Sequence, residues 1–198
     1  LRHRLSPRRV AVALVEEGVD QLVAYETVPM AFEIRSRVDL DHLRASKGFR
    51  IIEIPVRPRW KDYDAFPDSR PTALAAQFDM SNWLILSAFE GSRRLGGIIV
   101  ARDTPGCDML EGRNDLVVPF DIRVDPAAQG RGIGRRLFEY ATAWARSHGC
   151  TELHVETQDV NVAACRFYRA MGCELHSIRE GAYLPELDEA MVIWRLEL

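Results

Sequence analysis

The sequence predicts an α+β fold in which one sheet of mixed strand direction is flanked by helices. Short apolar runs with strand character dominate the first part of the chain, and a strand–helix–strand–helix order follows in the last part. No internal repeat and no linker between two composition regimes interrupts the 198 residues. This length suffices for one sizeable core and is too short for two ordinary enzyme domains, so we expect a single domain.

Composition and charge exclude several classes of protein. A hydrophobic content of 47% with 28% charged residues is typical of a folded globular chain. The formal net charge of -3 argues against a nucleic-acid-binding protein, which carries a clustered basic excess. No apolar run is long enough to span a bilayer, and Glu16 and Glu17 end the first one before it reaches the length of a signal-peptide core. We therefore expect a cytoplasmic protein without a membrane partner.

The four cysteines show neither zinc-ligand spacing nor the framework of a disulfide-rich domain. Reduced thiols in the cytosol and no bound metal are the expectation.

Strands and loops alternate in the first part of the chain. Val19–Glu26 predicts a short helix, and the prolines between Pro55 and Pro71 predict an irregular segment. Lys47 and Gly48 lie in a polar loop, and Asp103–Asp115 forms an acidic one. The apolar runs that predict strands are Val10–Val15, Phe32–Val38, Arg50–Val56, Trp83–Phe89 and Leu95–Ala101, the last two as an antiparallel hairpin.

The last part of the chain carries clearer periodicities. Phe120–Val124 alternates apolar and charged residues, which indicates a strand with one buried face. Pro119 cannot donate to a sheet ladder, so this strand starts or bulges there. An apolar stripe at Ile133, Leu137, Tyr140, Ala141 and Trp144 predicts a helix that ends at Gly149. The remaining expected elements are a strand at Leu153–Thr157, a helix at Asn161–Met171, and strands at Glu174–Ile178 and Met191–Leu198.

A glycine-rich turn joins the predicted strand at Phe120–Val124 to the following helix. It comprises Gln129, Gly130, Arg131, Gly132, Ile133 and Gly134. Glycines allow close approach of a ligand to the backbone, and the free amides and dipole of a helix start suit an anion such as a pyrophosphate. Arg131 and Arg135 add positive charge. Tight strand-to-helix packing would explain the turn equally well.

Two nucleotide-binding alternatives fail on spacing. The dinucleotide fingerprint requires a glycine at the position of Arg135, and the phosphate loop requires a Gly-Lys-Ser/Thr ending that the chain lacks.

Asn161 and Tyr168 stand seven residues apart, which places them on one helix face about 10 Å from each other. Either residue alone would be a helix cap or a core aromatic. Together they can line a long linear ligand such as coenzyme A.

These two motifs resemble those of the GNAT superfamily of N-acetyltransferases. Gln129-x-x-Gly132-x-Gly134 is similar to its coenzyme A motif, and Asn161-Val-Ala-Ala-Cys-Arg-Phe-Tyr168 with Gly172 is similar to its second motif. The resemblance implies acetyl-coenzyme A as co-substrate and a GNAT fold, with a mixed, mostly antiparallel central sheet flanked by helices. It implies one domain over residues 1–198 with a coenzyme A-binding core at about 117–173. Cys173, where many relatives carry Phe, is a departure at a packing position.

Three further stretches resemble the streptothricin acetyltransferase-like subgroup. They are Lys61–Asp64, Asp79–Trp83 and Glu156–Cys165. The likeness implies a small cationic amine as acceptor, for example an antibiotic of the streptothricin type.

The family resemblance also implies roles for single residues. Acetyl transfer would be direct, within a ternary complex, with Tyr168 as the general acid for the departing thiolate; Tyr183 is the alternative donor. Glu156 and Asp121 are candidates for the general base, although solvated or ion-paired carboxylates are the commoner case for such residues. The expected cofactor-binding residues are Ile122, Arg123, Val124, Gln129, Gly130, Arg131, Gly132, Ile133, Gly134, Arg135, Asn161 and Tyr168.

An aromatic and anionic pocket could select a cationic acceptor. Its candidate residues are Trp60, Tyr63, Asp64 and Trp83, with the acidic loop from Asp108 to Asp115 beside them. Burial of Trp83 in the core and solvation of the loop are the alternative.

Three functional classes remain open on the sequence. They are an acetyltransferase for small amines, an enzyme that acetylates a protein N-terminus or lysine, and a non-catalytic coenzyme A-binding regulatory module. Tyr168 favours an enzyme, and the absence of an appended domain favours the first class. A homodimer is compatible with the sequence.

Overall fold

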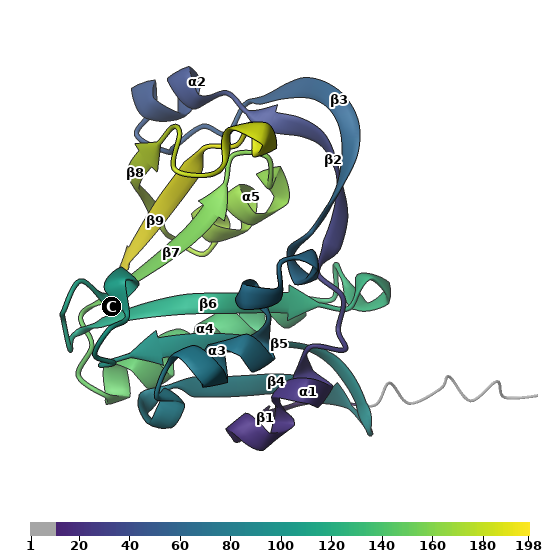
Figure 1. Cartoon of the computed structure of the whole chain (residues 1–198), viewed down its shortest axis with the longest axis vertical. Coiled ribbons are helices and arrows are strands. Elements are labelled where there is room, and N and C mark those ends of the chain that lie inside the picture. The colour runs from purple at the N-terminus through teal and green to yellow at the C-terminus, as the bar shows by residue number, and fades with distance from the viewer. Residues whose placement is uncertain (1–10) are drawn as a thin grey trace, which may run out of the picture.

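The computed structural model describes residues 11–198, so Val10 of the first expected strand and the basic residues before it lie outside the described residues. A seven-stranded sheet runs through the molecule in the order β1-β4-β5-β6-β7-β9-β8 (Figure 1). Only β6 and β7 pair in parallel among these neighbours, which confirms the mixed, mostly antiparallel sheet and the α+β class. The strands are β1 (Val12–Glu16), β4 (Leu84–Glu90), β5 (Arg93–Arg102), β6 (Leu116–Val124), β7 (Glu152–Gln158), β8 (Glu174–Arg179) and β9 (Met191–Glu197).

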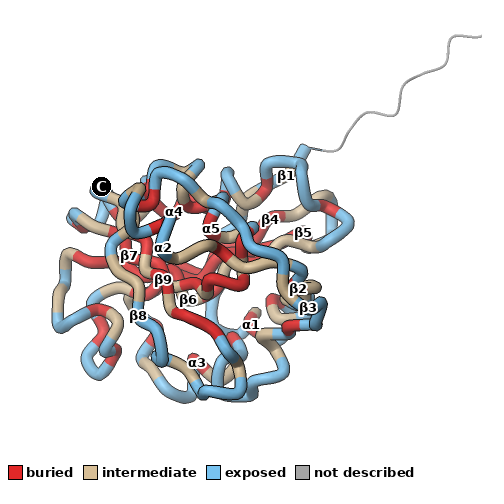
Figure 2. The backbone as a smooth tube through the Cα atoms, turned by 90° about the horizontal axis from the view of Figure 1, so that it is seen from above, coloured by how far each residue is buried: buried red, intermediate tan, exposed pale blue. Residues whose placement is uncertain are grey.

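Helices cover both faces of this sheet. Figure 1 shows α1 (Leu22–Tyr25) and α3 (Pro71–Gln77) in front of it and α4 (Ile133–Ser147) behind it. The apolar residues of α4 and of α5 (Val162–Ala170) share one core cluster with β4, β5, β7 and β9. Leu22, Tyr25 and Leu74 belong to a second cluster against the opposite face. The buried parts of the chain accordingly run through the middle of the molecule in Figure 2, because each helix turns its apolar stripe toward the sheet.

A separate two-stranded ribbon, β2 (Ala31–Val38) with β3 (Glu53–Asp62), curves along α5. The expected irregularity from Pro55 onward is wrong for the first part of that segment, because β3 continues through two prolines. A register shift between Ile34 and Ser36 lets the pairing pass Pro58, and β3 lies at an edge, where a missing donor is tolerated. The loop around Lys47 contains an unpredicted short helix, α2 (Leu40–Ala45), which is capped by Asp39.

Strand β6 begins earlier than expected and bulges where Pro119 predicts it. Ile99 pairs with Asp121 whereas Val100 pairs with Pro119, so Phe120 is the extra residue of the bulged strand. Strand β7 pairs with β6 only at Leu116↔Glu152 and Val117↔Leu153. Beyond these two pairs the strands diverge, as Figure 1 shows.

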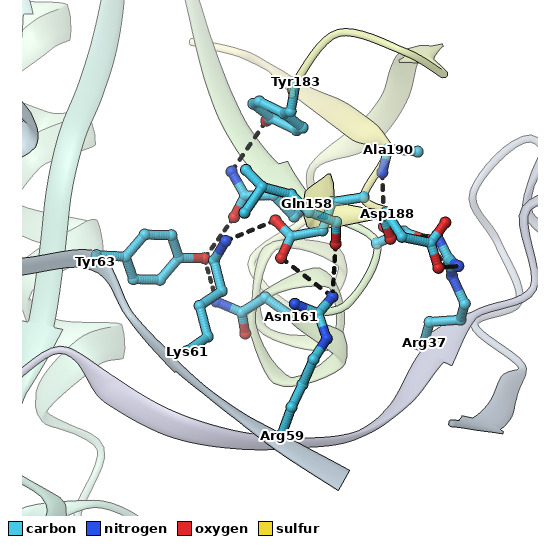
Figure 3. A network of polar contacts seen from close by, with 12 residues as sticks. Arg37, Arg59, Lys61, Tyr63, Gln158, Asn161, Tyr183, Asp188 and Ala190 are labelled. Atoms are coloured by element: carbon cyan, nitrogen blue, oxygen red, sulfur yellow. Dashed lines mark hydrogen bonds and ion pairs between the residues drawn. The ribbon is translucent and has the colours of Figure 1, made fainter. Parts of the chain in front are cut away.

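Two ion pairs, each to a buried carboxylate, fasten the ribbon to the main sheet (Figure 3). Arg37 of β2 lies 2.6 Å from the fully buried Asp159 after β7, and Lys61 of β3 lies 2.6 Å from Glu189 before β9. Both anions have further donors, since Ala190 N binds Asp159 and Arg59 binds Glu189. The end of β3 is therefore held at a defined place beside β7 and α5.

Within residues 11–198, no helix combines the length and apolar character needed to cross a membrane.

Gly97 of β5 provides a test of how closely α1 packs against the main sheet. A Cβ atom there would lie 2.2 Å from Cε2 of Tyr25 and 2.7 Å from the carbonyl oxygen of Leu86. Gly97→Ala should therefore lower the free energy of unfolding by about 1–3 kcal/mol, measured by urea denaturation. Gly134→Ala is the matched control, because its Cβ would make an ordinary 3.5 Å contact with Phe167 and alanine favours a helix. Equal stabilities of the two variants would contradict the close approach of Tyr25 to Gly97.

Candidate active site

A cavity of about 350 Å³ opens where β6 and β7 diverge. Strand β6 contributes Asp121, Ile122 and Arg123, and β7 contributes Glu156, Thr157 and Gln158. Helix α5 contributes Asn161, Ala164 and Tyr168, and the turn after β3 contributes Tyr63 and Asp64. The site thus unites segments that lie about a hundred residues apart in the sequence.

A second cavity, of about 260 Å³, lies at the glycine turn between β6 and α4. Its walls include Val124, the next residue of β6, and Phe167, the residue before Tyr168 on α5. Both cavities therefore follow the same groove between β6 and α5. The other expected residues that line the second cavity are Gln129, Gly130, Gly132, Ile133, Gly134 and Arg135. Arg131 does not line it, because its guanidinium pairs with Glu90.

The glycine turn has the conformation and the free space that an anion requires. Gly130 and Gly132 have φ angles of 73° and 77°, and a Cβ on either would meet no atom within 4 Å. Gly132 is the N-cap of α4 and supplies no side chain to the first amides of that helix. These donors at the positive end of a 15-residue helix are available to a phosphate group. These features suit the binding of an anionic group.

Asn161, the N-cap of α5, and Tyr168 of α5 both line the first cavity. Asn161 caps the helix, since its Oδ1 accepts from Ala164 N at 3.1 Å. Its Nδ2 donates to the hydroxyl of Tyr63 at 3.2 Å. Tyr168 is only 4% exposed, and within the described part of the chain no hydrogen bond reaches its hydroxyl. Burial raises the pKa of the Tyr168 phenol well above its ordinary value, so this hydroxyl keeps its proton at neutral pH.

Asp121 is engaged in a buried cluster of charges. Its Oδ1 accepts from the Tyr25 hydroxyl at 2.8 Å and from Arg123 Nε at 2.9 Å, and its Oδ2 lies 2.5 Å from Arg123 Nη2. Arg123 also contacts both oxygens of Asp64 at 3.2 Å. Both oxygens of Asp121 are thus occupied, which leaves this carboxylate poorly suited to accept a proton from a substrate.

Glu156 differs from Asp121 in having one oxygen without a partner. The hydroxyl of Tyr183 donates to Glu156 Oε1 at 2.6 Å, and within residues 11–198 no group binds Oε2. Of the two carboxylates that the sequence nominates as a base, Glu156 is the one with a free acceptor at the cavity.

The expected aromatic residues of the acceptor pocket lie in different places. Tyr63 lines the cavity, whereas Trp60 is 74% exposed on β3 and does not. Trp83 is buried, its indole nitrogen donates to Thr104 Oγ1 at 2.7 Å, and it packs behind the wall residues Phe78 and Phe120. The sequence gives no signal that α3 would bring Phe78 to this site.

The acidic loop contributes little charge to the cavity. Met109 lines it, but Asp115 pairs with Arg113, which also binds Glu152 of β7. Asp68, in the turn between β3 and α3, is an acidic wall residue that sequence reasoning missed.

The chain is similar to known acetyltransferases. Streptothricin acetyltransferase from Streptomyces lavendulae is 44% identical to the chain over 76 residues, which are 38% of this chain and 40% of that protein. Streptothricin acetyltransferase from Escherichia coli is 29% identical over 147 residues, covering 74% and 72% of the two chains. The chain therefore matches less than half of the first relative and almost three quarters of the second.

A solved structure supports the fold. The crystal structure of a Bacillus anthracis protein in complex with acetyl coenzyme A superposes with a TM-score of 0.69 at 21% identity, covering 95% of this chain and 100% of that one. A family model described as the acetyltransferase (GNAT) family matches residues 51–173, more than half of the chain. The chain belongs to the acetyltransferase (GNAT) family.

Proposed function

We propose that this protein transfers an acetyl group from acetyl-coenzyme A to a primary amine of a small cationic acceptor, directly and within a ternary complex. One observation carries the proposal. Glu156 and Tyr168 line the same cavity, and among residues 11–198 no partner binds one carboxylate oxygen of Glu156 or the protonated hydroxyl of Tyr168. Transfer from a thioester to an ammonium group requires such a proton acceptor and such a proton donor.

Acetyl-coenzyme A supplies an activated acetyl thioester. The glycine turn from Gln129 to Gly134 would hold its pyrophosphate on the first amides of α4, with Arg135 nearby. The backbone of Ile122, Arg123 and Val124 would pair with the pantetheine arm, since β6 has left its ladder with β7 at this point. Asn161 and Tyr168 would line the far end of that arm.

Two side chains would take part in proton transfer during the reaction. An aliphatic amine is protonated at neutral pH, because its pKa is near 10. Glu156 would accept the amine proton at Oε2, directly or through a water molecule. Tyr168 would hold a proton at its hydroxyl for the leaving thiolate, and its burial keeps that proton in place until it is needed.

Charge on the walls favours a cationic acceptor. Asp64, Asp68, Asp121 and Glu156 line the cavity, and Arg123 is the single cation among the described wall residues. Phe78, Phe120 and Tyr63 provide aromatic surface beside them. Such a wall steers and binds a cationic amine. The likeness to streptothricin acetyltransferases supports an antibiotic of that type as the acceptor.

Gly132→Val tests the anion turn. Valine at a φ of 77° is strained and would fill the space that the cofactor needs, so binding of acetyl-coenzyme A should be abolished in isothermal calorimetry. Gly106→Val is the matched control, because Gly106 has a φ of 79° and equally open surroundings away from both cavities. Unchanged affinity in a folded Gly132→Val protein would refute this assignment.

Tyr168→Phe tests the proton donor. The exchange keeps the ring and removes the proton, so kcat should fall by about 10²–10⁴ while the affinity for acetyl-coenzyme A stays nearly constant. Thiol release measures the first quantity and calorimetry the second. Turnover at the wild-type rate would assign Tyr168 to packing and make Tyr183 the alternative donor.

An acceptor panel tests the substrate class. We expect thiol release to be fastest with streptothricins, compared with aminoglycosides, polyamines, amino acids and peptides, and to weaken with rising salt. Asp68→Asn should raise KM for a cationic acceptor by about two- to fivefold, whereas Glu174→Gln, the same charge change on exposed β8, should not. Preference for peptides would favour a protein acetyltransferase, and binding without turnover would favour a regulatory module.

A further inference from the structure

Tyr183 connects Glu156 to a chain of hydrogen bonds that crosses the site. It lies between β8 and β9, and its hydroxyl donates to Glu156 Oε1 at 2.6 Å. The hydroxyl oxygen of Tyr183 in turn accepts from Gln158 Nε2 at 3.0 Å. Gln158 Oε1 accepts from the Tyr63 hydroxyl at 2.5 Å, which in turn accepts from Asn161 Nδ2 at 3.2 Å. Figure 3 shows the part of this chain from Asn161 through Tyr63 and Gln158 to Tyr183.

Each donor in this chain points in the same direction. An ionised carboxylate only accepts, so Tyr183 must donate to Glu156 and can accept only from the amide nitrogen of Gln158. The oxygen of Gln158 then faces Tyr63, and Tyr63 must donate to it. At the far end, Asn161 accepts from Ala164 N at the start of α5. A chain in which all donors align is cooperative, and it ends on the carboxylate.

The chain is also anchored from outside. The Lys61 ammonium lies 5.0 Å from the centre of the Tyr63 ring and pairs with Glu189, which belongs to the same β8–β9 connection as Tyr183. Burial raises the pKa of both phenols, and for Tyr183 the bond to Glu156 adds to the effect. Both hydroxyls therefore remain donors at neutral pH.

We propose that Tyr183 is a positioning residue for acetyl transfer, which holds Glu156 with one oxygen bound and the other free toward the acceptor amine. Through Gln158 and Tyr63, it also fixes Glu156 relative to Asn161, the cap of the helix that carries Tyr168. This inference rests on the proposed function, and it assigns the segment between β8 and β9 a part in the geometry of the reaction.

A double-mutant cycle separates this role from mere packing. Tyr183→Phe should lower kcat by about 10- to 100-fold and leave the affinity for acetyl-coenzyme A unchanged, because a displaced base loses its near-attack geometry. In a Glu156→Gln background the same exchange should have no further effect on kcat, since the group that it positions is already lost. Tyr140→Phe is the matched control, because it removes a 2.6 Å hydroxyl–carboxylate bond to Glu16 far from the cavity.

The outcomes distinguish this inference from the proposed function. A wild-type protein that acetylates no amine would refute both. If the wild type is active, unchanged kcat in Tyr183→Phe, or equal losses from Tyr183→Phe in both backgrounds, would refute the positioning role alone. Thermal unfolding of all variants shows whether a loss in kcat follows a loss in stability, which would also count against it.

Discussion

The early end of the parallel ladder between β6 and β7 is the constraint on which the rest of the site depends. The strands form two residue pairs, at Leu116 and Val117, and then separate, while the bulge at Phe120 bends β6. A continuous ladder would consume the backbone groups of β6 and close the space that the cavity occupies. Divergence leaves these groups to a ligand and sets the carboxylate of Glu156 and the hydroxyl of Tyr168 around one volume. The sheet is thereby interrupted at the cavity.

Buried charges keep the walls of this opening in place. Asp121 and Arg123 alternate with Ile122 on β6, so they share one face, and Tyr25 and Asp64 complete their hydrogen bonds from other parts of the chain. Removing one partner from such a group is costly, because a buried charge is left without compensation. Asp159 and Glu189 act similarly on the ribbon, whose own strands would form only a marginal hairpin. Electrostatic pairing thus specifies where Tyr63 and Asp64 stand.

One part of the site is formed mainly by backbone groups and the other mainly by side chains. The half that we propose for the cofactor relies on backbone conformation, with positive φ angles at Gly130 and Gly132 and a helix start without a side-chain cap. The half that we propose for the acceptor relies on side chains from the turn after β3, from α3, from β7 and from the segment around Tyr183. On this proposal, backbone geometry would bind the pyrophosphate, which is common to all reactions of such an enzyme, whereas side chains would set the charge and shape for one acceptor.

The sequence by itself determined the features that arise locally. The periodicity of the stripe from Ile133 to Trp144 predicts α4, and the spacing of Asn161 and Tyr168 places both on one helix face, because these are properties of a single helix. Only the tertiary structure shows how the surroundings of Glu156 and Asp121 differ, since Tyr183 and Tyr25 reach these carboxylates from distant parts of the chain. It likewise buried Trp83, exposed Trp60 and carried β3 through two prolines. These outcomes depend on contacts between residues that are distant along the chain. Local propensity does not predict such contacts, because it reflects only neighbouring residues.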